Sequence, residues 1–137
     1  MLKLIMCVTR RADLTREQFD HHWIEHHAPL VRAHQRVLGI NRYVQTILLA
    51  NPAAQMAIQA SRGTQAVDFD GCAELWWDSL DAHLAARKTP EGAKALQLLI
   101  EDERRFVDLG RSQLWYGTER SIIPEEYQPA TNLTHRG

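Results

Sequence analysis

The alternation of apolar and polar positions predicts four β-strands. Residues 2–9 form a run that is apolar on both alternating faces, which is typical of a strand inside a sheet. Three later runs are rich in β-branched and aromatic residues and are bounded by Gly, Pro, Asn or Asp. We therefore expect strands at residues 2–9, 40–50, 71–78 and 111–122.

The first helix has the strongest local signal in the chain. Thr15 is a good N-cap, and Gln18 stands where its side chain reaches back to complete a capping box. We expect a helix over residues 16–37, ended by Gly39. Pro29 lacks a backbone N–H, so we expect a kink there.

Two further helices are predicted after the third strand, over residues 79–87 with Ser79 as cap and over 90–107 with Pro at its first position. Residues 51–70 show no strand pattern and at most one helical turn. A connection of that length in a compact domain is often a binding loop or lid.

The order β-α-β-β-α-β, with the second helical segment in two pieces, predicts an α+β fold of the ferredoxin-like type with an antiparallel sheet. We assign residues 1–122 to this domain and 123–137 to a polar tail. Helices cover one sheet face, yet the strand at 71–78 is aromatic on both faces. A second copy of the chain would cover the other face, so we expect a homodimer.

The overall charge excludes several partners. Sixteen Lys and Arg balance seventeen Asp and Glu, giving a net charge of −1, which does not attract nucleic acid or an anionic membrane. No apolar stretch approaches the roughly 18 residues of a spanning helix. The two cysteines have no paired spacing and no signal peptide is evident, so we expect a cytoplasmic protein with free thiols.

Five of the seven histidines lie in the first predicted helix. On a regular helical wheel, His27 and His34 turn toward the sheet, whereas His21, His22 and His26 fall on its flank or solvent side. An inward imidazole is either a hydrogen-bonded core residue or a proton carrier beside a cavity. His22 and His26 have metal-pair spacing, but no third ligand or HExxH motif accompanies them, so we predict no metal site. The apolar arc of this helix comprises Phe19, Trp23, Ile24, Leu30, Val31 and Val37.

Glu74 is a carboxylate in an otherwise apolar strand. A structural partner for it is the simpler interpretation, and a role as proton donor is the alternative. Trp23, Tyr43 and Trp77 are core residues by default, but they could also wall an apolar substrate pocket.

Several motifs resemble the EthD-like family, named for ethyl tert-butyl ether degradation. They are Arg10-Arg11 after a strand, Leu14 to Phe19, the run His27-Ala28-Pro29-Leu30-Val31, the segment from Asp70 to Leu80, and Asp102-Glu103 before Phe106-Val107-Asp108. The resemblance spans about residues 3–118. It implies a dimeric α+β barrel, and it places the motif histidine at His27.

The resemblance and the inward histidines together suggest a small cofactor-independent enzyme. We expect it to act on an apolar aromatic or polyketide-like molecule by oxidation, isomerisation or elimination, with no bound cofactor. His27 would be the general acid or base, with His34 or Glu74 as second proton carrier. The alternatives are a non-catalytic binding protein for a hydrophobic intermediate and a haem or metal protein. The fold alone does not choose among them.

Overall fold

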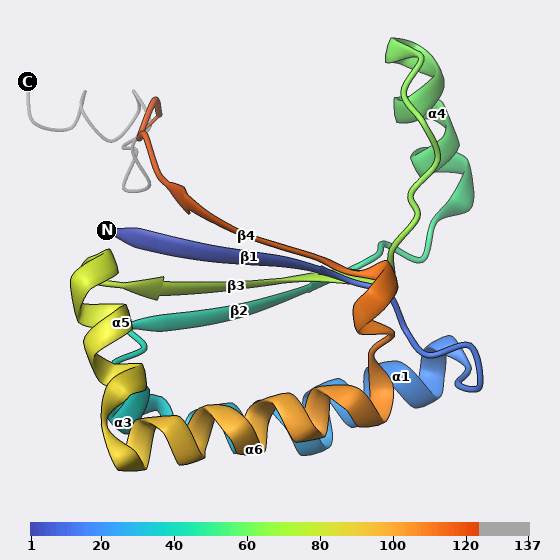
Figure 1. The fold of residues 1–137 in the computed structure, drawn as a ribbon. Coiled ribbons are helices and arrows are strands. Elements are labelled where there is room, and N and C mark those ends of the chain that lie inside the picture. The colour runs from blue at the N-terminus through green and yellow to red at the C-terminus, as the bar shows by residue number, and fades with distance from the viewer. Residues whose placement is uncertain (124–137) are drawn as a thin grey trace, which may run out of the picture.

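A computed structural model describes residues 1–123, which form a four-stranded antiparallel sheet with helices on one face (Figure 1). The strand order is β2-β3-β1-β4, so the first strand lies inside the sheet, as its two apolar faces predict. The α+β, ferredoxin-like fold is confirmed. The strands are β1 (Leu2–Val8), β2 (Arg42–Ile47), β3 (Gly71–Trp77) and β4 (Gln113–Thr118).

The last strand is shorter than predicted. β4 ends at Thr118, and residues 119–122 add no further strand. The predicted polar tail at 123–137 lies outside the described residues except for its first position. The prediction of a domain boundary at that point is therefore untested.

The predicted first helix is divided into four pieces. They are α1 (Arg16–His22), a π-helical turn (Trp23–His27), α2 (Ala28–Ala33) and α3 (Gln35–Leu38). The capping box is confirmed, because the Gln18 N–H donates to Thr15 Oγ1 and the Thr15 N–H donates to Gln18 Oε1. Gly39 ends the segment with φ +68°.

The irregularity precedes Pro29 instead of lying at it. Proline clashes with the carbonyl four residues earlier and offers that carbonyl no N–H. The backbone therefore widens before Pro29, and the Ala28 N–H donates to the Trp23 carbonyl five residues back. Pro29 itself lies in the first turn of α2, where no N–H is needed.

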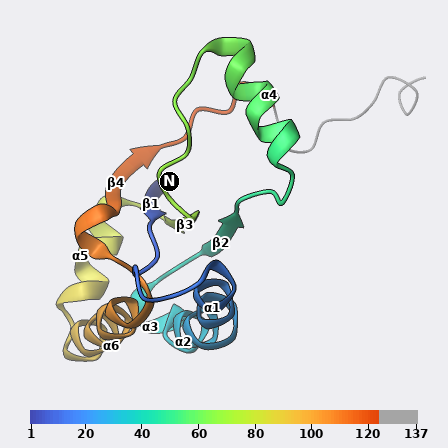
Figure 2. The same cartoon turned by 90° about the vertical axis from the view of Figure 1, so that its right-hand side faces the viewer.

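The connection between β2 and β3 holds a helix that was not predicted at its full length. α4 (Pro52–Arg62) begins at the N-cap Asn51 and ends at Gly63 with φ +66°. It projects from one end of the sheet, on the side opposite to α1, α2 and α6 (Figures 1 and 2). None of its residues is buried, so it does not belong to the domain core.

The remaining helices match their start signals. Ser79 caps α5 (Leu80–Lys88), and Thr89 caps α6 (Pro90–Phe106). Together with α1 to α3 they cover one sheet face and bury Val31, Leu38, Trp77, Leu99, Phe19 and Phe106. None of the helices within residues 1–123 is long and apolar enough to cross a lipid bilayer.

The opposite sheet face has no helix lying across it within residues 1–123 (Figure 2). It carries the alternate side chains of the strands, which are largely apolar near the middle. Trp76 is buried on this face. The Lys3 ammonium lies 4.9 Å and the Arg42 guanidinium 4.6 Å from the centre of its ring. Side chains on this face include Ile5, Cys7, Val44, Cys72 and Trp115.

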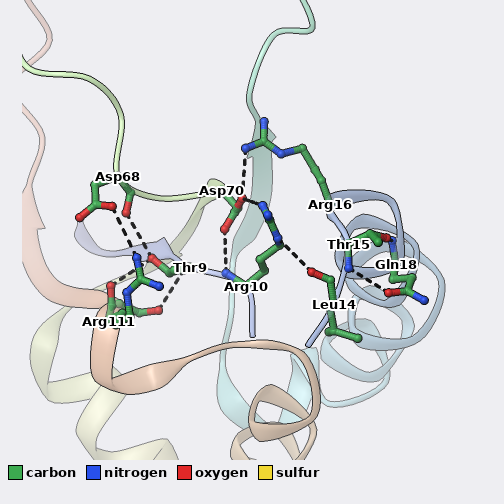
Figure 3. Close-up of polar contacts among 10 residues, drawn as sticks. Thr9, Arg10, Leu14, Thr15, Arg16, Gln18, Asp68, Asp70 and Arg111 are labelled. Atoms are coloured by element: carbon green, nitrogen blue, oxygen red, sulfur yellow. Dashed lines mark hydrogen bonds and ion pairs between the residues drawn. The ribbon is translucent and has the colours of Figure 1, made fainter. Parts of the chain in front are cut away.

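A buried carboxylate joins the beginning of α1 to the sheet (Figure 3). Asp70, just before β3, accepts hydrogen bonds from the backbone N–H and the Nη1 of Arg10, each at 2.8 Å. Arg16 Nη2 lies 3.3 Å from the same carboxylate, and Arg10 Nε donates to the Leu14 carbonyl. These contacts fix the helical segment that carries His27.

Candidate active site

A cavity of about 300 Å³ lies between the helices and the sheet. Its walls are mainly apolar and come from β1, β3, α6 and β4, including Leu4, Met6, Leu75, Leu99, Phe106 and Leu114. Polar groups are few, as in pockets that bind small organic molecules. His27, Tyr43 and Glu103 are among them.

His27 is a buried histidine of the cavity lining. It is 5% exposed, and its Nδ1 lies 2.8 Å from Asp102 Oδ2 on α6. Its ring packs 5.1 Å from the ring of Phe106. The inward orientation predicted for His27 is confirmed.

Asp102 binds a second histidine and an arginine as well. His22 Nε2 lies 3.0 Å from Asp102 Oδ1, and Arg105 Nη1 lies 3.2 Å from the same oxygen. Burial alone would raise the pKa of Asp102, but the hydrogen bonds with His27 and His22 outweigh it and lower the pKa below its ordinary value. The carboxylate is therefore ionised at neutral pH.

The π-helical turn brings the two histidines together. Residues five apart in a regular α-helix differ by about 140° around the axis. A turn with five-residue hydrogen bonds instead aligns such residues on one side. His22 and His27 therefore both face Asp102. Gln45 Nε2 donates to the Trp23 carbonyl at 3.1 Å, which ties this turn to β2.

The Asp102 contact decides which nitrogen of His27 is basic. An ionised carboxylate only accepts hydrogen bonds, so Nδ1 carries the hydrogen and Nε2 keeps its lone pair. Burial lowers the pKa of His27, although Asp102 opposes this effect. A neutral imidazole with an oriented N–H and a free basic nitrogen is suited to accept a proton.

Glu103 is a titratable carboxyl group of the cavity lining. Burial, together with the negative charge of Asp102, raises its pKa to about 7. No hydrogen bond or ion pair holds its side chain within residues 1–123. Tyr43, which also lines the cavity, accepts a hydrogen bond from Gln45 Nε2 at 2.8 Å. Burial raises the pKa of this phenol.

The structure brings three of the six predicted site residues together. His27, Tyr43 and Trp77 line the cavity. Trp23 is instead a core residue, 2% exposed and packed 5.4 Å from Phe19. The cavity lining does not include it.

His34 and Glu74 lie away from His27. The His34 Nδ1 is 2.9 Å from the Leu30 carbonyl in its own helix, and its side chain does not line the cavity. Glu74 forms an ion pair with Lys3 on the opposite sheet face, so it has the structural partner that its strand position suggested. Neither residue is part of the cavity lining.

Two predictions about the surface histidines differ in outcome. His21 and His26 are exposed, as expected. His22 is not a solvated surface residue, because it binds Asp102 and its side chain is 23% exposed. Within residues 1–123, no group of three or more His, Cys, Asp and Glu side chains is placed to hold a metal ion.

The carboxylates of α6, Asp102 and Glu103, were not among the predicted site residues. Ala95, Leu99, Asp102 and Phe106 are buried at helical spacing, so Asp102 occupies a core position of an amphipathic helix. A carboxylate on that face needs a partner. This pattern was the available signal, and it was read only as part of a family motif.

Comparison with known proteins identifies relatives along most of the chain. The EthD domain matches residues 11–110. The decarboxylase AgnL1 of Paecilomyces divaricatus is 26% identical over 123 residues, covering 89% of this chain and 80% of that protein.

Solved structures share the fold. A crystal structure of an EthD-family protein from Bacillus halodurans has a TM-score of 0.58 at 23% identity, covering 88% of this chain and 99% of that one. SnoaB, a cofactor-independent oxygenase from Streptomyces nogalater, has a TM-score of 0.51 at 17% identity, covering 90% and 97%. At these identities the likeness establishes the fold alone.

Proposed function

Because the EthD domain covers residues 11–110, the chain belongs to the EthD family, and we propose that it is a cofactor-independent enzyme with His27 as its general acid/base. Its substrate class is an apolar aromatic or polyketide-like molecule. One observation carries the proposal. His27, held by Asp102 at 2.8 Å, lines a mainly apolar cavity of about 300 Å³.

The proposed chemistry begins with proton removal. His27 Nε2 takes a proton from a phenol, an enol or a carbon next to a carbonyl, and the nearby Asp102 carboxylate stabilises the imidazolium that forms. Glu103, with a pKa of about 7, can supply a proton to the substrate and later recover one from solvent. Two groups with different roles in one cavity permit net proton transfer without a cofactor.

Among such reactions we favour decarboxylation, because a 26% identical relative is a decarboxylase. The bond from the ring or chain carbon to the carboxylate breaks, and CO₂ leaves. The electron pair remains on that carbon, which takes a proton from Glu103 or from the His27 imidazolium. No oxidant or reductant is consumed.

The test is an assay of CO₂ release and product mass with a panel of aromatic and polyketide hydroxycarboxylic acids. We expect turnover by the natural chain and a loss of about 10²-fold or more in kcat for His27→Ala. His21→Ala, an exposed histidine at the surface of the same segment, is the matched control and should retain activity. Equal activity of His27→Ala and the natural chain would exclude this role, and unchanged recovery of every bound compound would favour a binding protein.

We also propose that two copies pair through the uncovered sheet face. Ile5, Val44 and Trp115 lie on that face, and Trp115 is 51% exposed. Covering these side chains with a second sheet removes apolar area from water. Sedimentation should show a dimer for the natural chain and a monomer for Ile5→Glu. Leu98→Glu, on the outer side of α6, should remain a dimer.

A further inference from the structure

Polar side chains also gather at a second part of the cavity, formed by α5 and β4. Arg87 Nη1 lies 3.3 Å from Tyr116 Oη and 3.4 Å from His83 Nε2. Tyr116 Oη lies 2.9 Å from His83 Nε2. All three residues line the same cavity as His27. We call Arg87, His83 and Tyr116 the arginine cluster.

The arginine cluster and His27 lie toward opposite ends of the sheet. Tyr116 pairs with Leu4 of β1. His27 packs against Phe106, and Phe106 belongs to the same group of buried, mutually contacting side chains as Val8, near the other end of β1. Val8 lies four positions after Leu4, so the Cα atoms of these two residues are about 13 Å apart along the strand. A molecule that reaches both groups is therefore elongated, with several rings or an extended chain.

Arg87 has no carboxylate partner within residues 1–123. Its hydrogen bonds go to a neutral phenol and an imidazole. A guanidinium is always protonated, and it forms its strongest hydrogen bonds with carboxylates and other oxyanions. A half-buried arginine beside apolar walls is therefore well placed to pair with an oxyanion in the cavity.

His83 is the buried member of the arginine cluster. It is 4% exposed, and its Nδ1 is a buried polar atom with no hydrogen-bond partner among residues 1–123. Because Arg87 donates to Nε2, Nε2 is the acceptor and Nδ1 carries the hydrogen. Burial and the charge of Arg87 lower the pKa of His83, so its ring is a neutral donor.

We propose that the arginine cluster is an anion subsite that holds a carboxylate or ionised phenol at one end of an elongated aromatic or polyketide-like ligand. Arg87 pairs with the oxyanion. Tyr116 accepts a hydrogen bond from Arg87 and donates its own hydrogen to His83 Nε2, which holds the guanidinium in place. The apolar body lies along Leu4, Leu75 and Leu99. That the other end reacts at His27 rests on the proposed function, whereas the preference for an anion rests on the cluster alone.

The test compares two probes of nearly equal shape, anthraquinone-2-carboxylate and the neutral anthraquinone-2-carboxamide, by isothermal titration calorimetry. We expect the natural chain to bind the acid at least 10-fold more tightly than the amide. Arg87→Gln should weaken acid binding by about 10- to 100-fold, the range of a charge-assisted hydrogen bond. It should change the affinity for the amide less than threefold.

Three variants complete the experiment. Lys88→Gln removes a neighbouring exposed cation of α5 and should leave both affinities unchanged. Arg87→Lys keeps the charge and should retain part of the preference for the acid. His27→Ala should keep the full preference even if it abolishes turnover, which separates the subsite from the proposed reaction.

Two results would overturn the subsite. One is equal affinity of the natural chain for the acid and the amide, or no binding of the acid at 1 mM. The other is an Arg87→Gln variant that weakens both probes alike while circular dichroism shows an intact fold. A normal acid preference in a chain that turns over no substrate would instead refute the proposed function and leave the subsite standing.

Discussion

His27 Nδ1 lies 2.8 Å from Asp102 Oδ2, although the two residues are 75 positions apart in the chain. The contact joins the π-helical turn to α6 and leaves Nε2 as the imidazole nitrogen that can accept a proton. His22 and Arg105 form hydrogen bonds with the other carboxylate oxygen, Asp102 Oδ1. The proposed chemistry therefore depends on Asp102 as a positioning residue.

Replacing Asp102 by Asn should reduce kcat by about 10²-fold or more. The amide can donate to His27 Nδ1, which moves the hydrogen to Nε2 and removes the basic nitrogen. The measurement is kcat as a function of pH, since a purely structural loss would leave the shape of the profile unchanged. Glu101→Gln, an exposed change on the same helix, should retain the natural kcat and profile. An Asp102→Asn enzyme with natural kcat would refute this role.

Glu103 should make the fold less stable at alkaline pH. Its pKa is raised from 4.5 to about 7, so between these values the folded chain binds a proton that the unfolded chain does not. Its contribution to stability therefore falls as pH rises through this interval. Glu103→Gln removes the effect and should raise the free energy of unfolding by about 2 to 3 kcal/mol at pH 8.5, with little change at pH 4.5.

Urea unfolding at both pH values measures this difference. Glu101→Gln is again the matched control, and its stability should follow the natural chain within about 0.5 kcal/mol. A Glu103→Gln variant with the same stability change at pH 4.5 and pH 8.5 would contradict the assignment of a buried, titrating carboxyl.

Asp70→Asn should destabilise the fold by about 3 kcal/mol. The change leaves Arg10 without its buried partner, since the Asp70 side chain is 7% exposed and lies 2.8 Å from Arg10 Nη1. Asp68→Asn provides the contrast, because Asp68 is 94% exposed and 3.6 Å from Arg111, and it should cost less than about 0.5 kcal/mol. The midpoints of urea unfolding measure the loss of stability in each variant. A similar loss in Asp70→Asn and Asp68→Asn would be inconsistent with a structural role specific to Asp70.

Gly71→Ala should cost about 1 to 3 kcal/mol. A Cβ at Gly71 would lie 2.7 Å from Trp23 Cζ3 and 2.8 Å from the Thr46 carbonyl oxygen. The contact with Trp23 would also shift the π-helical turn. Gly110→Ala, whose Cβ would meet only an ordinary contact at 3.6 Å, should leave the thermal midpoint nearly unchanged. If the thermal midpoint of Gly71→Ala were as high as that of Gly110→Ala, the backbone around Gly71 would be able to shift and relieve the contact with Trp23.

The local patterns of the chain predicted most of its helices and strands because the signals are local. Thr15, Ser79 and Thr89 cap helices through residues three positions away. The two apolar faces of residues 2–8 likewise predicted an interior strand. α4 was largely missed, although its sequence carries local helix signals, with Asn51 as N-cap, Pro52 in the first turn and Gly63 after the last residue.

The wheel of the first helix shows where local reasoning failed. Ile24 was placed on the buried arc, yet it is 54% exposed, and His22 was placed toward solvent, yet it binds Asp102. Both errors arise because the helical wheel assumes a rotation of 100° per residue, whereas the segment contains a π-helical turn, in which the rotation per residue is smaller. His27 was placed correctly.

By itself, the sequence determined the strand order along the chain, the helix caps, the inward position of His27 and the resemblance to the EthD family. The tertiary structure alone decided that Asp102 is the partner of His27, that Glu103 and Arg87 line the same cavity, and that Glu74 faces the other side of the sheet. The physical reason is that caps and alternation depend on neighbours a few residues away. The His27–Asp102 contact depends on how two segments 75 residues apart in the chain pack against each other.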